Sequence, residues 1–389
     1  MNILYSYASF RFTDKEEVGG EEKVAWGTVY GMAKRGHICY VMSPEIELSR
    51  DYENIIPIFI KRCAFRKEKN KVMRKIKAYV FLLESYKQAK KLIKKKKIDV
   101  IHHIRPSYPG FFSPVSGLGV PFVLGGITVP YREWNNQNKR ISERIKIYLW
   151  NKMLSNSSAV LFEVKEAFKY VPDKYRNESY LFYNGVDTQF FYPSSDKNMT
   201  KDYLNILFVG RLMPLKGIDV FLEAVSILSK KLDRNFRVKI AGWGEIDRYK
   251  ALCVDKKIDK IVDFCGVLDR DKLRKLYQSS DIFVLPSRKD NGPNSLLEAM
   301  SCGLPVIASN VMGIPEIVSH DTNGLLVPPS DPVALADAIE VLMLDDKRRQ
   351  LMSENNRQLM VSRFDWNVYV DRLEKVYRDV QKSFSYSRK

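Results

Sequence analysis

Short runs of apolar residues alternate along the chain with longer segments in which apolar residues recur at helical spacing. This alternation is typical of parallel β-sheets whose strands are joined by crossover helices. It occurs in both halves of the chain and predicts two doubly wound, Rossmann-like α/β domains that face each other across a cleft. The predicted strands are residues 3–5, 38–41, 100–101, 121–124 and 159–162, then 205–209, 237–241, 262–264, 281–285 and 305–308.

A polar, turn-rich stretch separates the two halves and predicts a linker. We therefore expect a first domain at residues 1–187, the linker at 188–202 and a second domain at 203–365. Ligands of doubly wound sheets lie beside the carboxyl ends of the strands, so the expected ligand site is the cleft between the domains.

Composition fits this picture and excludes other classes of protein. The 389 residues are 45% hydrophobic and include five widely spaced cysteines without a C-x-x-C motif, which argues against a disulfide scaffold or a zinc cluster. The N-terminus has the pattern of a first strand and not of a signal peptide. The uncharged stretch 106–131 contains five prolines, so we expect loops and a buried strand there instead of a membrane-spanning helix. A soluble, cytoplasmic protein is expected.

The first candidate binding loop contains Gly19 and Gly20, between the first predicted strand and a helix. Paired glycines let a ligand approach the backbone, and a helix N-terminus offers free N–H groups to an anion. The loop matches neither G-x-G-x-x-G nor a P-loop, and the alternative is a flexible turn.

The second candidate loop follows the strand that ends at Gly210. Arg211 and Lys216 lie five residues apart there, just before a helix that begins near Ile218. Two cations and a helix N-terminus at one strand end suit a diphosphate. The alternative is that both are solvated surface cations.

The third candidate surrounds a predicted helix over residues 295–301. Asp290 lies in the loop before it and Glu298 within it, while Asn294 or Ser295 is expected to cap its N-terminus. Two carboxylates eight residues apart suit binding of two different groups that carry hydroxyls. The alternative is a purely structural cap and a glutamate on the helix face.

In order and spacing, these motifs resemble the donor-binding half of the retaining nucleotide-sugar glycosyltransferases of family 4 (glycosyl transferases group 1), which have the GT-B fold. The first half of the chain is similar more weakly, through Gly19-Gly20 and residues 35–37. Residues 366–385 resemble the family's closing helix, which crosses back and completes the first domain. The matching pieces of the second half are 210–211 with 216–217, 241–244, 264–266, 290–298, 313–318 and 322–329.

The resemblance implies that the first domain binds the acceptor and the second the donor. Arg211 and Lys216 would hold the donor diphosphate and stabilise the charge of the leaving nucleotide, Asp290 would hold hydroxyls of the transferred sugar, and Glu298 would bind the ribose. No metal or other cofactor is then required, and Asp269, in a sequence that mimics a metal-binding D-x-D, is expected to cap a helix. The full implied donor-binding set is Gly19, Gly20, Gly210, Arg211, Lys216, Gly242, Asp290, Asn294, Ser295, Leu296 and Glu298.

The sequence departs from the family pattern at two places. Asp290 stands where the family usually has glutamate, and the histidine that many relatives carry after the strand at 121–124 is absent. His102 and His103 follow another strand at its cleft-facing end. They are candidates for contact with the acceptor or substrate, although a structural role is the favoured interpretation.

We therefore expect a retaining glycosyltransferase with a nucleotide-diphosphate sugar donor and a saccharide or lipid-linked acceptor, in cell-envelope polysaccharide or glycolipid biosynthesis. The alternative enzyme is a nucleotide-sugar epimerase of the same fold, which would need a carboxylate and histidine acid/base set in the cleft. A protein without enzymatic activity that binds nucleic acid or membrane through charge alone would leave the ordered spacing of Arg211, Lys216 and Glu298 unexplained.

The net charge of +18 is concentrated in one place. Residues 61–97 contain 16 basic residues and only two acidic ones, Glu68 and Glu84. Apolar residues recur between the lysines at helical spacing, for example at Val72, Ile76 and Leu83. Such a helix favours an anionic membrane surface and peripheral association with the inner face of the cell membrane. The alternative is a core-packed helix with a solvated lysine face.

Overall fold

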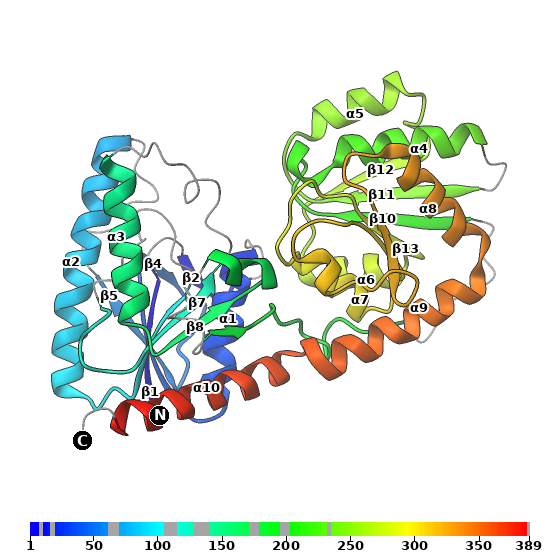
Figure 1. The fold of residues 1–389 in the computed structure, drawn as a ribbon. Helices are drawn as coiled ribbons and strands as arrows, with labels where there is room; N and C mark the ends of the chain where they lie inside the picture. Colours follow the sequence, from blue (N-terminus) through cyan, green and yellow to red (C-terminus); the bar gives the residue numbers. More distant parts are fainter. Residues whose placement is uncertain are drawn as a thin grey trace. The chain divides into compact units, whose positions relative to one another are not determined.

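The computed structural model describes residues 1–7, 11–15, 20–60, 70–104, 115–127, 141–170, 179–194, 203–231 and 235–386. The chain forms two compact units, each built around its own parallel sheet (Figure 1). The first unit contains Met1–Tyr183 together with Trp366–Lys389, and the second contains Asn184–Asp365. The second unit thus begins just before the expected linker, of which residues 195–202 lie outside the described residues.

The main sheet of the first unit has the strand order β5-β3-β1-β6-β7-β8-β9, and every pair in it is parallel. A separate pair, β2 and β4, lies outside it. The elements are β1 (Asn2–Ser6), β2 (Arg11–Thr13), α1 (Gly20–Lys34), β3 (Ile38–Ser43), β4 (Glu45–Glu47), β5 (Ile55–Phe59), α2 (Lys71–Lys95), β6 (Val100–Ile104), β7 (Phe122–Ile127), α3 (Ile141–Ser155), β8 (Ala159–Phe162), the 3-10 helix η1 (Lys165–Tyr170), β9 (Ser179–Leu181) and α10 (Trp366–Tyr386).

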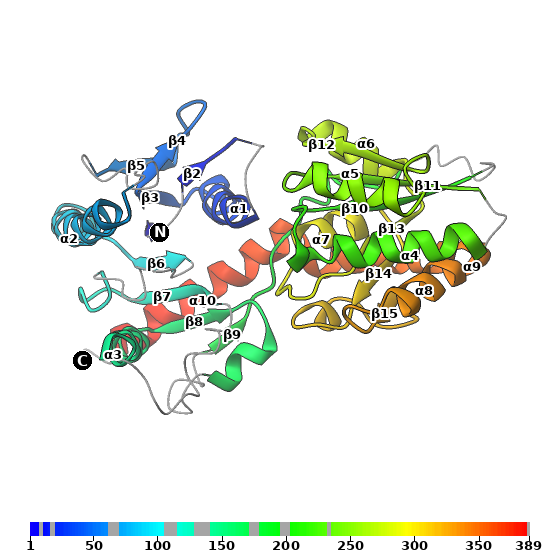
Figure 2. The ribbon, with the colours of Figure 1, turned by 90° about the horizontal axis from the view of Figure 1, so that it is seen from above.

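Helices cover both faces of this sheet, as a doubly wound fold requires (Figure 2). Phe81 of α2 and Trp150 of α3 join the buried cluster on one face. Val29 of α1 and Leu373 of α10 join the cluster on the other. The first unit therefore takes its last covering helix from the far end of the chain, as the family resemblance implied.

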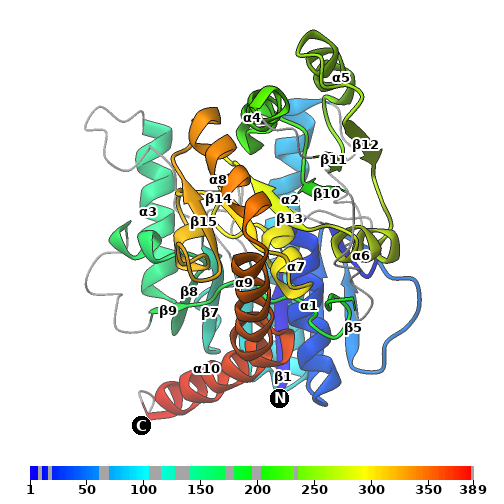
Figure 3. The ribbon, with the colours of Figure 1, turned by 90° about the vertical axis from the view of Figure 1, so that its right-hand side faces the viewer.

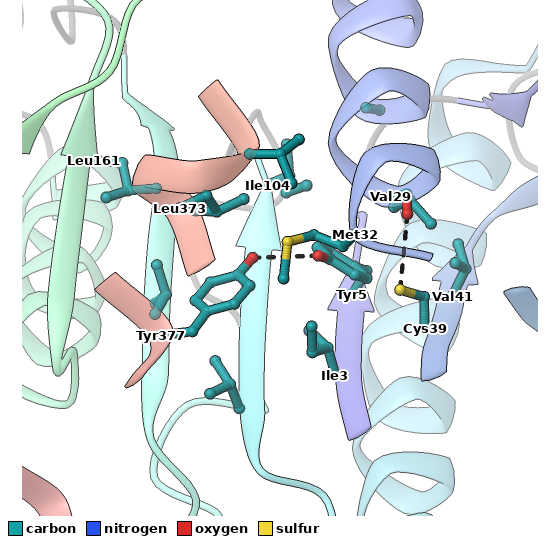
Figure 4. Close-up of a cluster of buried hydrophobic side chains, with 14 of the residues drawn as sticks. Ile3, Tyr5, Val29, Met32, Cys39, Val41, Ile104, Leu161, Leu373 and Tyr377 are labelled. Carbon is teal, nitrogen blue, oxygen red and sulfur yellow. Dashed lines mark hydrogen bonds between the residues drawn. The ribbon is translucent and has the colours of Figure 1, made fainter. Parts of the chain in front are cut away.

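Two glycines of α1 let α10 pack closely against it. A Cβ atom at Gly27 would lie 2.5 Å from the indole of Trp366, and one at Gly31 would lie 2.4 Å from the side chain of Val370. Tyr377 of α10 reaches the middle of the sheet, where its hydroxyl donates to the hydroxyl of Tyr5 at 3.3 Å (Figure 4). Burial raises the pKa of both tyrosines well above their usual value.

The second unit has a six-stranded sheet of order β12-β11-β10-β13-β14-β15, and all its pairs are parallel. Its elements are β10 (Leu204–Val209), the 3-10 helix η3 (Pro214–Lys216), α4 (Ile218–Lys231), β11 (Phe236–Ala241), α5 (Ile246–Asp255), β12 (Val262–Gly266), α6 (Arg270–Gln278), β13 (Ile282–Leu285), α7 (Asn294–Ser301), β14 (Val306–Ser309), the 3-10 helix η4 (Ile314–Glu316), β15 (Gly324–Val327), α8 (Pro332–Leu344), α9 (Asp346–Leu359) and the π-helical turn η5 (Met360–Phe364).

Local chemistry explains where these elements form. The strands β10, β13 and β14 are continuous buried runs, as expected for strands covered on both faces. Asp269 caps α6 by accepting a bond from the backbone N–H of Lys272 at 2.8 Å, so its prediction as a helix cap is confirmed. Asp331 caps α8 in the same way, with Pro332 in the first turn. Helix α4 packs against α8, and α7 lies beside α9 (Figure 3).

All ten strands predicted from apolar runs are present, and the fold class is confirmed. The sequence interpretation missed β2, β4, β5, β9 and β15. Of the cysteines, Cys39, Cys253 and Cys302 are buried with free thiols, Cys265 is half-buried and Cys63 lies outside the described residues. Within the described ranges, no helix combines the length and the apolar character needed to cross a membrane.

Candidate functional site

The site in the second unit begins where β10 ends. Gly210 leads into Arg211, whose side chain is exposed and has no partner among the residues that the structure describes. The chain then turns through η3 and leaves it at Gly217, which has a φ of +70°. A Cβ atom at Gly217 would lie 1.9 Å from the carbonyl oxygen of Pro286. Only glycine therefore lets this loop lie directly against the loop that follows β13.

That close approach brings two of the predicted residues together. The ammonium group of Lys216 forms an ion pair with the carboxylate of Asp290, although the two residues are 74 positions apart. The Ser287 hydroxyl donates to the same carboxylate at 3.3 Å. The side chains of Lys216 and Asp290 are only 16% and 11% exposed. Each charge is thus largely withdrawn from water and compensated by the other.

Arg288 fixes the position of the loop that carries Asp290. Both terminal nitrogens of its guanidinium donate to the carboxylate of Asp219 at 2.7 Å, and one also donates to the carbonyl of Pro214. These bonds lower the pKa of Asp219 and raise that of Arg288. The sequence interpretation missed this pair, because neither residue falls in a motif that predicts a ligand.

Glu298 is buried within α7, with 6% of its surface exposed. Its carboxylate accepts a hydrogen bond of 3.0 Å from the hydroxyl of Tyr277, a residue of α6 that the sequence interpretation also missed. Tyr277 is fully buried, and burial together with the negative charge of Glu298 raises its pKa well above the usual value. Tyr277 therefore stays a neutral donor and holds the Glu298 carboxylate in place.

The N-terminus of α7 differs from the sequence prediction. The capping position is Pro293, which makes no side-chain capping bond, so the prediction that Asn294 or Ser295 would cap the helix was wrong. The helix already begins at Asn294, so Asn294 and Ser295 lie in its first turn and not at the capping position. The side chain of Leu296 is buried, and its N–H donates to the carbonyl of Pro293 at 3.1 Å.

Asn184 holds the turn in front of α7. Its amide nitrogen donates to the carbonyl of Gly292 and to the side-chain oxygen of Asn294, both at 3.1 Å. Sequence reasoning had no signal for this role, because Asn184 lies more than a hundred positions away from the turn.

A third loop, after β11, completes this end of the sheet. Gly242 has a φ of +142°, and a Cβ atom there would lie 1.8 Å from the carbonyl oxygen of Gly210. The next residue, Trp243, is 61% exposed, and its carbonyl accepts a bond from the N–H of Leu212 at 2.8 Å. Three loops at neighbouring strand ends are therefore packed together by backbone contacts that require glycine.

The candidates in the first unit lie in different surroundings. Gly20 is the first residue of α1, and Gly19 lies outside the described residues. His102 and His103 are each only 1% exposed, on β6. Nδ1 of His102 lies 2.5 Å from the hydroxyl of Tyr377, and a Cβ atom at Gly125 would lie 2.2 Å from Nε2 of His102.

Burial keeps both imidazoles neutral. It lowers the pKa of His102 to about 3, with a smaller contribution from the neighbouring His103, and lowers the pKa of His103 to about 4. Both side chains belong to the core and not to an open surface, which favours the structural interpretation over contact with acceptor or substrate. Within the described part of the chain, no three His, Cys, Asp or Glu side chains are grouped so that they could hold a metal ion.

Two family models match the chain. "Glycosyltransferase Family 4" matches residues 18–190, and "Glycosyl transferases group 1" matches residues 193–359. An uncharacterized glycosyltransferase of Methanocaldococcus jannaschii is 26% identical over 310 residues, which are 79% of this chain and 83% of that protein. A D-inositol 3-phosphate glycosyltransferase of Corynebacterium jeikeium is 32% identical over 212 residues, half of each chain.

Solved structures show the same fold. A glycosyltransferase of Rickettsia africae superposes with a TM-score of 0.73 at 18% identity, covering 98% of this chain and 99% of that one. HepE of Anabaena, in complex with UDP-glucose, superposes with a TM-score of 0.67 at 16% identity, covering 97% of this chain and all of that one. With both halves matched by their family models, this chain belongs to the family 4 (group 1) glycosyltransferases and has the GT-B fold.

Proposed function

We propose that this glycosyltransferase moves a sugar from a nucleotide-diphosphate donor to an acceptor hydroxyl with retention of anomeric configuration. The observation that carries the proposal is the convergence, at one end of a parallel sheet, of Arg211, the Lys216–Asp290 pair and the buried Glu298. The UDP-glucose bound by the similarly folded HepE supports a donor of this class.

The charges of the site suit the binding of a diphosphate. Without a ligand, the ammonium of Lys216 is neutralised by Asp290. A diphosphate would compete for that ammonium and for the exposed guanidinium of Arg211. Asp290 would then accept hydrogen bonds from sugar hydroxyls. The uncapped first turn of α7 would add backbone N–H groups and the positive end of a helix dipole.

Glu298 is suited to recognise the ribose. A carboxylate offers about four lone-pair sites, so it can accept from ribose hydroxyls and keep its bond from Tyr277. Since that bond fixes its orientation, Glu298 would contribute to binding with little loss of side-chain freedom.

In the proposed reaction, the bond between the anomeric carbon and the diphosphate oxygen breaks, and a bond from that carbon to the acceptor oxygen forms on the same face of the sugar. The acceptor proton passes to the leaving phosphate. Negative charge grows on the leaving group, and Arg211 and Lys216 would stabilise it. We propose that no metal ion is needed, because these two cations supply the charge that a divalent ion would otherwise provide.

The proposed acceptor is a saccharide or a lipid-linked saccharide of the cell envelope. A lipid-linked acceptor would bring the enzyme to the inner face of the cell membrane, so we propose peripheral association there. The support for this part is the family resemblance and the basic segment 61–97.

The test is incubation of the wild-type enzyme with a panel of nucleotide-diphosphate sugars and candidate acceptors, with chelator present. We expect release of nucleoside diphosphate from one donor and a product whose anomeric configuration, measured by NMR, equals that of the donor. An inverted product would overturn the retaining mechanism. Interconversion of the nucleotide sugar without release of nucleotide would indicate the epimerase instead.

A further inference from the structure

Helix α2 carries two separate apolar faces. The first packs on the core of its own unit and contains Phe81 and Ala89, both buried. The second is turned to solvent over the first half of the helix and consists of Val72, Met73, Ile76, Val80 and Leu83. At about 100° per residue, these five positions share one side of the helix, opposite the buried residues. We call the five residues the apolar stripe.

The side chains of the apolar stripe are strongly exposed. Val72 is 67% exposed, Leu83 is 64% exposed and Ile76 is 48% exposed. One side of the helix is packed on the core and its lysines are exposed, as the core-packed interpretation predicted, but that interpretation does not account for the exposed stripe. Contiguous exposed apolar side chains on a soluble protein mark a surface that binds something.

The same side of the helix becomes basic over its second half. Lys87, Lys90, Lys91 and Lys94 continue the line of the stripe and are all exposed. The sequence 71–97 contains eleven basic residues and one acidic residue, Glu84, which pairs with Lys87 at 2.9 Å. Outside the basic segment 61–97, the basic and acidic residues of 1–190 are equal in number, 17 of each. The charge is therefore a property of this surface and not of the whole unit.

We infer that α2 docks on an anionic lipid bilayer, with the apolar stripe inserted at the level of the headgroups and the lysines of its second half bound to acidic lipids. An apolar half and a lysine half on one helix side match the two components of such a surface, an apolar interior and an anionic exterior. A second copy of this chain matches it less well. Parallel pairing of two α2 helices would oppose lysine to lysine, and antiparallel pairing would lay lysines on the stripe.

The test is sedimentation of the full chain with vesicles of phosphatidylcholine alone or with about one-third phosphatidylglycerol. We expect binding only to the anionic vesicles, weakened by salt because exposed charges are screened. Ile76→Gln/Leu83→Gln and, separately, Lys90→Gln/Lys94→Gln should each reduce binding by about tenfold. The matched controls are Val254→Gln/Leu351→Gln and Lys250→Gln/Lys260→Gln, which change exposed residues of the second unit and should bind like wild type.

Three results would overturn the inference. They are absence of wild-type binding to anionic vesicles, wild-type binding by the stripe variant, and a dimer of the wild type that the stripe variant converts to a monomer in light scattering. Circular dichroism and thermal melts check that the variants fold. Turnover of the donor with a soluble acceptor should be unchanged in all of them, so failure of membrane binding and failure of the proposed enzyme activity remain distinguishable.

Discussion

Hydrogen bonds between distant residues set the orientation of the charged groups in the candidate site. Lys216 and Asp290 pair across two loops, and Tyr277 donates to the buried Glu298. The motifs in the sequence identified three of these four residues. They did not identify Tyr277, Arg288 or Asn184, because each acts through a partner that only the folded chain brings near.

Removal of the Tyr277 hydroxyl tests the role of its bond to Glu298. Tyr277→Phe leaves a buried carboxylate with one donor fewer, so we expect a loss of about 1 kcal/mol in the free energy of unfolding and weaker binding of nucleoside diphosphate by several-fold. Chemical denaturation and calorimetric titration measure these quantities.

Tyr249→Phe is the matched control for this prediction. The Tyr249 hydroxyl is buried in the same unit and has no hydrogen-bond partner among the described residues. Its removal should therefore leave stability and nucleotide binding unchanged or slightly improved. If both variants bind nucleotide as wild type does, the assignment of Tyr277 as a positioning residue for the site fails.

His103 provides a test of pH dependence. Its ring nitrogens have no hydrogen-bond partners among the described residues, and burial lowers its folded-state pKa from 6.5 to about 4. The unfolded chain therefore binds more protons between these pH values. The contribution of His103 to stability is present above pH 6.5 and is lost as pH falls toward 4, with a slope of about 1.4 kcal/mol per pH unit.

His103→Leu should remove that slope and cost little at pH 7, since no hydrogen bond is lost. The measurement is urea denaturation of wild type and variant at pH 7, 6 and 5. A variant with the full acid sensitivity of wild type would show that His103 is not buried as a neutral group.

At the level of elements, the loops after β10, β11 and β13 form one packed structure because glycine stands where they touch. Gly217 and Gly242 both have positive φ, and neither leaves space for a side chain. The loops thereby hold Arg211, Lys216 and Asp290 at neighbouring strand ends.

Gly217→Ala tests this packing. The new Cβ atom would collide with the carbonyl oxygen of Pro286, in addition to the cost of a positive φ. Gly266→Ala is the matched control, because Gly266 has nearly the same φ, +67°, but no atom within 4 Å of a new Cβ. We expect Gly217→Ala to lose at least about 2 kcal/mol more stability than the control in thermal or urea unfolding, and nucleotide binding as well. Equal losses would mean that only the φ, and not the loop contact, matters.

The elements that the sequence predicted correctly are those with strong local signals. Continuous apolar runs identified the buried strands, whereas β5 was missed because Pro57 interrupts it and its edge position leaves residues exposed. Helix α2 was the hardest case. Two apolar faces overlap in one sequence, so helical spacing alone could not separate Phe81, on the core face, from Leu83, on the exposed one.

On the scale of the whole molecule, the excess of basic residues and the candidate donor site lie in different units. The first unit carries the basic helix α2, and the second carries the loops that we propose bind the donor. The family resemblance implied this division of roles between the two units, and it stays a prediction. The close packing of α10 could not be predicted from the order of motifs, because it depends on two glycines of α1 more than 330 residues away.

In the proposed reaction, the cation at Lys216 stabilises the leaving nucleoside diphosphate. The most direct measurement is kcat/KM for the donor that the wild type consumes, compared between Lys216→Gln and Lys230→Gln, which removes an exposed lysine of α4 in the same unit. We expect a loss of about 10²- to 10³-fold for Lys216→Gln and less than a twofold change for Lys230→Gln. Turnover by Lys216→Gln at the wild-type rate would show that Lys216 does not stabilise the leaving group.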